Sequence, residues 1–508
     1  MSLPGLASLL EESGVEPERI LVDGSAGGRG NSPDGDGTVA PGRDYVLYWM
    51  QKAQRPADNP ALALAIHAAD RLGLPLLVLF VLTDYPAANP NHYRFMLHGL
   101  RECATMLRER GIGFALRAGE PAVVAAEAAR HAALVLCDAG RLRIERRWRE
   151  DLALNLRGGQ DGNSGRQAPL IHVETEAVVP PDSVSPKEEY SAATIRPKIS
   201  GQLPRFLHVA ARVSVSGSAR VFALAKPVLK AFPSGCEDSR DALFASYDAP
   251  AAPEYPGDRI AEQTIRFKPG FTAGMERFEE FACGGALDRY DADRNDPCKD
   301  GQSGMSPYLH FGQVSPVRLA GEALGRPGPS SQAFVEQLVV RRELAANFVL
   351  RNPGYDRYES AVPAWAREGL AAVRQRPTVY READLEAAAT QDRFWNAAQN
   401  ELVLTGKMHN YMRMYWGKRL LAWHADPECA YRIALRFNDR YSLDGRDPNG
   451  YSGVAWCFGR HDRPWPLQPL FGNVRAMVPG RLSVKFDAAA YAERVESMYI
   501  RNTTRGKR

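Results

Sequence analysis

Long apolar runs, which a membrane protein needs, are missing from this 508-residue sequence. The longest, from Pro75 to Leu82, is far shorter than the roughly 20 residues with which a helix crosses a bilayer. The N-terminus has no positive patch followed by an apolar stretch, so the sequence predicts no secretory signal. We therefore expect a cytoplasmic protein.

Several common cofactor motifs are missing as well. The seven cysteines are scattered with no CxxC pair, which favours reduced structural thiols, and no metal site is predicted. No GxGxxG motif or P-loop follows the first predicted strand, so the usual dinucleotide and triphosphate sites are not indicated. A net charge of only +4 does not by itself indicate a nucleic-acid binder, although a local basic face is compatible with it.

The first third of the chain alternates short apolar runs with segments of helical spacing. The predicted strands are Tyr45 to Met50, Pro75 to Leu82, Gly113 to Leu116, Ala133 to Cys137 and Leu170 to Val173. The helical segments between them are Ala61 to Leu72, Tyr93 to Arg110, Pro121 to Ala132 and Leu142 to Leu156. This alternation predicts an α/β domain with a Rossmann-like, five-stranded parallel sheet covered on both faces.

Glycine-rich and proline-rich stretches mark the borders of this domain. Residues Asp23 to Gly37 are rich in Gly, Ser and Asp, which predicts a flexible lead-in over 1–42. We place the α/β domain at 43–178, ending beyond a Gly- and Asn-rich loop at Gly158 to Gly165. A connector with several prolines follows at 179–270.

The second half of the sequence has few strand-like runs. Long amphipathic segments dominate it, such as Ser331 to Leu350 and Phe394 to Trp423. The region 271–508 is therefore predicted to be an all-helical domain.

A serine-containing string, Gln302 to Phe311, is the first candidate site. Ser306 precedes Pro307, an order typical of a helix N-cap followed by proline at the first helical position. Free N–H groups and hydroxyls at a helix start suit a phosphate or pyrophosphate. A plain helix cap that binds nothing is the alternative.

Aromatic residues gather in the segment Phe394 to Trp423. Trp416 and Trp423 are seven residues apart and would share a helix face about 10 Å apart, while Trp395 begins the segment and Tyr380 precedes it. Such a stripe usually packs in a core. The rings can pass electrons by hopping only if a redox cofactor lies nearby.

Polar residues between Asn438 and Tyr451 form a third candidate. The run Leu443 to Tyr451 is dense in turn-forming residues, and a surface loop is the ordinary interpretation. Its carboxylates, arginine and amide would also suit a polar ring system and ribose hydroxyls.

A fourth candidate lies on the predicted helix from Ser331 to Leu350. Glu336, Val340, Glu343 and Asn347 fall on one face of this helix. A solvated acidic face is one interpretation, and a glutamate that binds a base edge in a cleft is the other.

Together these segments resemble the class II cyclobutane pyrimidine dimer photolyases of the photolyase/cryptochrome superfamily. The matching strings occur in the family's order between Tyr45 and Met477. They are Tyr48-Trp-Met-Gln51, Thr194-Ile-Arg-Pro-Lys-Ile199, Ser303-Gly-Met-Ser-Pro-Tyr-Leu-His-Phe-Gly-Gln313, Arg341-Arg-Glu-Leu344, Gly406-Lys-Met-His-Asn-Tyr-Met-Arg-Met-Tyr-Trp416 and Leu443-Asp-Gly-Arg-Asp-Pro-Asn-Gly450.

The resemblance implies an α/β antenna domain and a helical domain that binds FAD non-covalently, active when fully reduced. By matching position, the FAD phosphates would be bound by Tyr290, Ser303, Gly304, Met305 and Ser306. The rest of the cofactor would be surrounded by Asn410, Arg413, Asp444, Asp447 and Asn449. Arg413 would pair with Asp444, and Asn438 would face the flavin ring and stabilise its reduced, anionic form.

The resemblance also assigns the aromatic residues. Trp395, Trp416 and Trp423 would form an electron-transfer chain, with Tyr380 as a side branch. The lesion pocket, with catalytic roles, would be lined by Glu336, Met414, Trp456 and Trp465.

Two departures from the family pattern concern this lesion pocket. Val340 and Arg341 stand where related enzymes place a tryptophan near the lesion. The stretch from Trp456 to Trp465 is one residue shorter than usual and contains Pro464.

The implied activity is that of a deoxyribodipyrimidine photo-lyase. Under blue light, one electron from reduced FAD would split cyclobutane dimers in single- or double-stranded DNA, and the cofactor would carry the difficult chemistry. We expect a monomer, nucleoid-associated if prokaryotic, with an antenna chromophore of unknown type in the first domain.

Two other functions stay open. A cryptochrome-like photoreceptor would be favoured by a long C-terminal tail, whereas only Val495 to Arg508 follow the last helical pattern. A flavin-binding module without catalysis would have a broken lesion pocket, whereas Glu336, Met414 and Trp456 are present.

Overall fold

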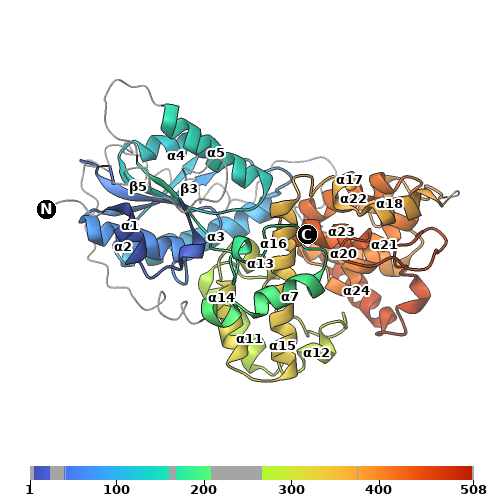
Figure 1. Cartoon of the computed structure of the whole chain (residues 1–508). Helices are drawn as coiled ribbons and strands as arrows, with labels where there is room; N and C mark the ends of the chain where they lie inside the picture. Colours follow the sequence, from blue (N-terminus) through green and yellow to red (C-terminus); the bar gives the residue numbers. More distant parts are fainter. Residues whose placement is uncertain are drawn as a thin grey trace.

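A computed structural model of the chain describes residues 5–22, 39–40, 42–158, 168–207, 266–373 and 376–505. An N-terminal α/β domain, blue to teal in Figure 1, lies beside a larger helical body coloured yellow to red. The predicted fold class is confirmed. Of the glycine-rich segments predicted at 23–37 and 158–165, only Gly158 lies among the described residues.

A six-stranded sheet with the order β1-β6-β5-β2-β3-β4 forms the centre of the α/β domain. All neighbouring strands are parallel except β1, which pairs antiparallel with β6. The five predicted parallel strands are therefore present, and the short edge strand β1 is an addition that the sequence pattern did not predict. The strands are β1 (Ile20–Val22), β2 (Tyr45–Trp49), β3 (Leu76–Leu82), β4 (Gly113–Ala118), β5 (Ala132–Asp138) and β6 (Leu170–Val173).

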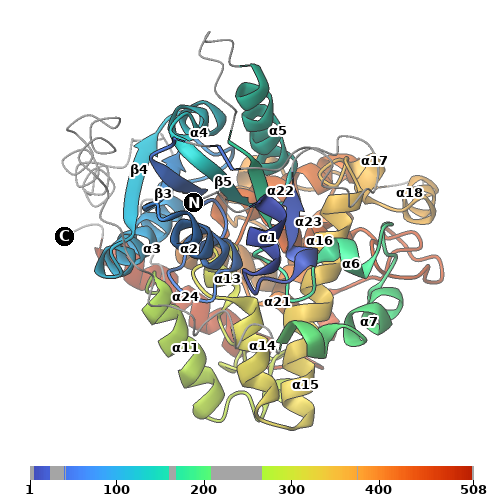
Figure 2. The same ribbon diagram turned by 60° about the vertical axis from the view of Figure 1, so that its left-hand side comes forward.

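Helices cover both faces of this sheet, which explains why its strands are continuous apolar runs (Figure 2). Val46 and Tyr48 of β2 belong to the core beneath α1, α2 and α3, whereas Leu47 and Trp49 belong to the core beneath α4 and α5. This is the two-residue period of a strand. The helices are α1 (Leu6–Glu11), α2 (Pro60–Leu72), α3 (Pro90–Glu109), α4 (Pro121–Ala129) and α5 (Arg143–Gly158).

Residues before the first predicted strand also take part in the α/β domain. Leu6 and Leu9 of α1 are buried in its core, and β1 extends its sheet. The segment 6–22 is therefore folded onto this domain, although the sequence placed it in a flexible lead-in.

The first part of the predicted connector packs against the helical body. It contains the helices α6 (Pro181–Val184) and α7 (Ala192–Ser200). The backbone N–H of Glu189, between them, donates to Asn347 Oδ1 at 2.7 Å. Residues 208–265 lie outside the described residues.

The helical body contains the two long amphipathic segments that were predicted to be helical. The segment from Ser331 to Leu350 is helical throughout, with α15 (Pro329–Val335), a π-helical stretch η3 (Glu336–Arg341) and α16 (Arg342–Arg351) in succession. The segment from Phe394 to Trp423, predicted as one long amphipathic segment, is also helical but consists of two helices.

Two helices form this second segment, because the chain turns at Gly406. This residue ends α20 (Arg393–Thr405) in the left-handed conformation, with a φ of 69°, which glycine adopts without strain. The next helix, α21 (Asn410–Ala422), then folds back against α20.

The other helices surround these elements. No helix in the described part of the chain is both long and apolar enough to cross a membrane. The remaining helices of four or more residues are α11 (Phe271–Cys283), α12 (Tyr290–Asp293), α13 (Ser306–His310), α14 (Pro316–Leu324), α17 (Tyr358–Ala361), α18 (Ala364–Ala371), α19 (Glu382–Glu386), α22 (Pro427–Tyr441), α23 (Pro448–Cys457) and α24 (Ala488–Arg505).

Candidate active site

A cavity of about 730 Å³ lies in the helical body, and we call it the cofactor cavity. Eight of the residues predicted to bind a cofactor line it, although they are up to 159 positions apart in the sequence. They are Tyr290, Ser303, Met305, Ser306, Arg413, Asp444, Asp447 and Asn449.

The other three predicted cofactor residues do not line this cavity. Gly304 stands between two lining residues, and Asn410 begins α21 with an exposed side chain. Asn438 is buried directly behind the lining residue Gly450, where an added Cβ would lie 2.8 Å from Asn438 Nδ2.

The serine loop differs from its prediction in one detail. Helix α13 begins at Ser306 itself, so this residue is not the N-cap, and its hydroxyl instead contacts the Lys407 ammonium. Gly304 has a φ of 72°, and a Cβ there would lie 3.1 Å from Arg277 and Phe267. The tight turn therefore requires glycine at this position.

Asp444 is the centre of a buried charge cluster. Its carboxylate is 2.7 Å from Lys407 Nζ and 3.3 Å from Arg413 Nη2, which confirms the predicted pair with Arg413. Burial alone would raise the pKa of Asp444, but the two cations hold it far below its ordinary value. Lys407 was not predicted, although it stands in the matching string that begins at Gly406.

Asp447 organises the other side of the cavity. Its Oδ1 accepts from the backbone N–H of Asn449, at the start of α23, and from Asn449 Nδ2, both at 2.9 Å. Its Oδ2 is 3.3 Å from Nδ1 of the buried His310. Burial lowers the pKa of His310, while the Asp447 carboxylate opposes this shift.

The tryptophans form a continuous row in the core. The ring of Trp395 stacks on that of Trp416 with centroids 6.4 Å apart, and it makes an edge contact with the ring of Trp423 at 5.4 Å. The ring centroid of Tyr380 lies 5.0 Å from that of Trp423. The order in space is therefore Trp416, Trp395, Trp423, Tyr380, and only the fold places Trp395 of α20 between Trp416 of α21 and Trp423, which follows that helix.

The predicted lesion-pocket residues are brought together in part. Glu336 pairs with Arg196 of α7, with contacts of 2.9 and 3.0 Å, and with Arg341 at 3.3 Å. The Arg341 guanidinium lies 5.3 Å from the centre of a Trp456 ring. Arg341 therefore links Glu336 to Trp456.

Met414 and Trp465 contact other neighbours. Met414 Sδ is 3.9 Å from Sγ of Cys457, the residue after Trp456. Trp465 lies in the following loop, where its ring is flanked by the guanidiniums of Arg463 and Arg475 at 5.7 and 5.2 Å.

The rest of the predicted acidic face serves a different purpose. Glu343 is buried and accepts from the backbone N–H groups of Val178 and Val179 at 2.8 and 3.0 Å. Burial raises its pKa to about 7. Glu343 is therefore neither on a solvated face nor in the lesion pocket. Its bonds hold the end of the α/β domain against the helical body.

A second cavity, of about 820 Å³, lies between the α/β domain and the helical body. Its wall includes Trp49, Tyr85 and Trp148, and both amide atoms of Gln51 and the amide oxygen of Gln54 at this place have no hydrogen-bond partner. The sequence did not predict this cavity, although the string Tyr48 to Gln51 lies at the carboxyl end of a parallel strand, where such folds bind ligands.

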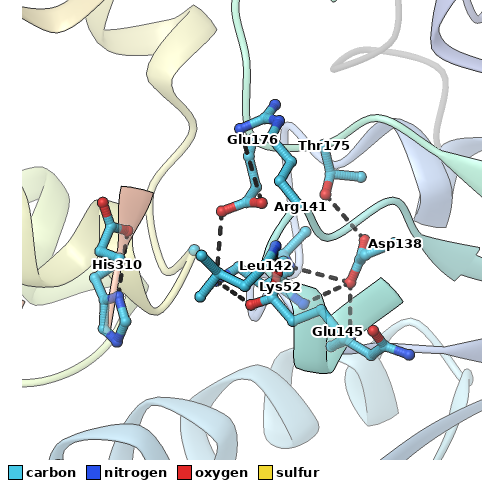
Figure 3. A network of polar contacts seen from close by, with 12 residues as sticks. Lys52, Asp138, Arg141, Leu142, Glu145, Thr175, Glu176 and His310 are labelled. Atoms are coloured by element: carbon cyan, nitrogen blue, oxygen red, sulfur yellow. Dashed lines mark hydrogen bonds and ion pairs between the residues drawn. The ribbon is translucent and has the colours of Figure 1, made fainter. Parts of the chain in front are cut away.

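A buried polar network supports the wall of this second cavity (Figure 3). Lys52 Nζ is 3.0 Å from Glu145 and 3.5 Å from Glu176, and these carboxylates hold the pKa of Lys52 above its ordinary value despite its burial. Asp138, at the end of β5, accepts from three successive backbone N–H groups beginning at Gln51, at 2.7 to 3.2 Å. His310 lines both cavities.

Known proteins resemble this chain over most of its length. The family model described as DNA photolyase matches residues 46–214. The deoxyribodipyrimidine photo-lyase of Methanothermobacter thermautotrophicus is 41% identical over 457 residues, which are 89% of this chain and 95% of that enzyme. The chain belongs to the DNA photolyase family.

Other photolyases support this assignment, and two solved structures share the fold. The photolyase of Oryza sativa is 38% identical over 89% of this chain and 88% of its own. That of Potorous tridactylus is 36% identical over 88% and 81%. A class III photolyase from Agrobacterium tumefaciens has the same fold, with a TM-score of 0.63 and 17% identity over 89% of this chain and 86% of that one. A Synechocystis cryptochrome gives a TM-score of 0.59 with 16% identity over 85% of each chain.

Proposed function

We propose that this photolyase is a class II deoxyribodipyrimidine photo-lyase that uses blue light and fully reduced, non-covalently bound FAD. Its substrate would be cyclobutane pyrimidine dimers in single- or double-stranded DNA, repaired by a monomer. The observation that carries the proposal is the convergence of the cofactor-matched residues on one cavity beside the tryptophan row. The photo-lyase names of relatives at 36 to 41% identity support it.

The side chains around the cofactor cavity fit FAD. The hydroxyl of Ser306 and the cations of Lys407 and Arg413 suit phosphate oxygens. The carboxylate of Asp447 can accept from ribose hydroxyls. Gly450 leaves open a place beside the Asn438 amide that a side chain would fill.

The remaining residues would place the lesion. Bound FAD would supply one electron to the dimer and recover it after the ring opens. Trp456 offers an aromatic wall for a dimer flipped out of the duplex, which costs less than flipping normal, well-stacked bases. Glu336 can accept from base N–H groups, while Arg341 contacts both residues.

We infer that the second cavity binds the antenna chromophore. Aromatic rings of Trp49, Tyr85 and Trp148 suit a flat pigment, and the unpaired Gln51 amide and Gln54 amide oxygen suit its polar edge. The type of pigment stays open.

The absorption spectrum of the purified protein tests both ligands. We expect a yellow or blue protein that releases FAD when denatured, with a further band if the second cavity is filled. Replacement of Gln54 by Leu should weaken that further band and leave the FAD content unchanged. A colourless protein that also fails to take up added FAD would contradict the proposed function.

Repair assays test the substrate. The residues matched to the lesion pocket offer no pair of histidines, which (6-4) lesion repair is thought to need as general acids. His409 precedes the cofactor-matched Asn410 in the sequence, and His461 Nδ1 donates to the backbone oxygen of Tyr190. We expect reversal of cyclobutane dimers by the reduced enzyme under blue light. Efficient reversal of (6-4) lesions alone would refute the assignment.

Glu336→Ala should lower dimer repair. Loss of a hydrogen bond between a charged group and the lesion costs about 1–3 kcal/mol, which lowers kcat/KM by about five- to 150-fold. Glu336→Gln, which keeps one acceptor oxygen, should lose less. Equal repair by Glu336→Ala and the wild-type enzyme would remove Glu336 from the pocket.

A further inference from the structure

The far end of the tryptophan row carries a cation. The guanidinium of Arg419, on α21, lies over the ring of Trp423, with its Cζ 4.6 Å from the ring centroid. Its Nε donates to Asp392 Oδ2 at 3.1 Å. Trp423 is 5% exposed, and the side chains of Arg419 and Asp392 are 17% and 7% exposed, so water screens these charges only in part.

The carboxylate of Asp392 holds this guanidinium in place. Its Oδ1 accepts from the backbone N–H of Trp395 at 3.1 Å, because Asp392 is the N-cap of α20. Its Oδ2 accepts from the hydroxyl of Tyr415 as well as from Arg419. Since two further donors fix the carboxylate, the guanidinium keeps its position on Trp423. The carboxylate also offsets part of its positive charge.

The charge of Arg419 acts in opposite ways on the neutral and the oxidised ring of Trp423. A neutral indole presents the negative face of its quadrupole to a cation and attracts it. After the ring has lost an electron it is itself positive, and it repels a cation at this distance. Both effects make Trp423 harder to oxidise.

A tyrosine lies next to this ring. The planes of Tyr380 and Trp423 are 80° apart, with the ring centroids at 5.0 Å. The hydroxyl oxygen of Tyr380 accepts from the backbone N–H of Gln391 at 3.0 Å, and this bond is exposed, so the hydroxyl proton can pass to water. Tyr380 was expected as a side branch of the row, and the cation over Trp423 gives electron transfer from that branch a driving force.

We propose that Arg419 is a positioning residue of the row, which acts through Trp423 and sends the electron vacancy left by photoreduction on to Tyr380. In this step the oxidised Trp423 ring takes one electron from Tyr380, and the Tyr380 hydroxyl gives its proton to water. The products are a neutral Trp423 and a neutral tyrosyl radical, so no positive ring remains beside Arg419. The inference rests on the proposed function, in which the row supplies electrons to the flavin.

The radicals present in the row after a pulse of blue light test this role. Full-length protein loaded with oxidised FAD is excited, and the ratio of tyrosyl to tryptophanyl radicals is followed by time-resolved absorption and electron paramagnetic resonance. Arg419→Gln removes the charge and should lower this ratio at least about tenfold, because a nearby unit charge that is only partly screened outweighs thermal energy. Arg419→Lys keeps the charge and should stay close to the wild type. Tyr380→Phe should lose the tyrosyl signal.

A second substitution, of opposite sign, serves if Arg419→Gln does not fold. Asp392→Asn keeps an acceptor oxygen for Arg419 and removes the charge that offsets it, so it should raise the ratio. Arg143→Gln is the matched control, because Arg143 lies over the ring of Tyr355, 5.2 Å from its centroid, and pairs with Asp356 at 2.6 Å, outside the row. This control should leave the ratio unchanged.

An unchanged ratio in folded Arg419→Gln with full FAD content would overturn the inference. So would a lower ratio in Asp392→Asn, or a wild-type tryptophanyl radical that persists without any tyrosyl signal. Wild-type protein that binds no FAD, or that binds it and forms no radical in the row, would refute the proposed function and the inference with it. The failure of the inference alone is therefore distinguishable.

Discussion

Trp416→Phe is expected to slow the photoreduction of oxidised flavin by at least about tenfold. A tenfold slower rate corresponds to an activation barrier about 1.4 kcal/mol higher. Trp416 is the end of the row nearest to the cofactor cavity, because it lies one helical turn after the lining residue Arg413 on α21. Trp395 and Trp423 continue the row away from it. A phenylalanine ring is much harder to oxidise than an indole, so the substitution breaks the row at its first step.

The measurement is the loss of oxidised-flavin absorbance under blue light with an external electron donor. Repair by chemically reduced Trp416→Phe enzyme should stay close to wild type, because the row serves only to reduce the flavin. Trp365→Phe is a matched control, since Trp365 is a partly buried indole against Gly459 and outside the row. If Trp416→Phe is photoreduced like the wild type, the row is only core packing.

Asp444→Ala is expected to abolish stable FAD binding and to lower the free energy of unfolding by about 3–5 kcal/mol. The substitution leaves Lys407 and Arg413 close together in a largely buried cavity without their shared carboxylate. Burial already lowers the pKa of Lys407, and Asp444 is the group that counteracts this most. The cost is therefore that of an uncompensated buried charge.

Urea unfolding and FAD titration of the apoprotein provide the two measurements. Asp444→Asn, which keeps the shape and one acceptor oxygen, should lose less stability than Asp444→Ala. Asp384→Ala is the surface control, because the partner of Asp384, Arg381, is exposed. Loss of this ion pair should leave the midpoint of unfolding and the FAD affinity unchanged. An Asp444→Ala protein with normal stability and FAD affinity would show that the cluster is dispensable.

The strands could be predicted closely because each buried position along a strand favours an apolar residue. The run predicted from Pro75 to Leu82 differs from β3 by a single residue, since both faces of the parallel sheet are covered and no polar position interrupts it. The edge strand β1 escaped prediction for the opposite reason. Its three residues are partly buried or exposed and give no pattern of their own.

Helix borders were less predictable where a single residue decides them. Gly406 divides α20 from α21, yet an isolated glycine inside an amphipathic segment is compatible with an unbroken helix. Its left-handed conformation depends on how the two helices pack and on a bond from the Leu443 N–H to its oxygen at 2.8 Å. Such a partner, 37 positions away, is invisible to local sequence patterns.

The sequence by itself determined the alternation of strands and helices, the family strings and the residue types that suit FAD, because local periodicity and side-chain chemistry are carried by short segments. Only the tertiary structure decided how these groups meet. It placed Trp395 between Trp416 and Trp423, gave Glu336 its arginine partners, and made His310 a wall of both cavities. The physical reason is that each of these contacts joins elements far apart in the chain, whose relative positions are fixed by packing of the whole core.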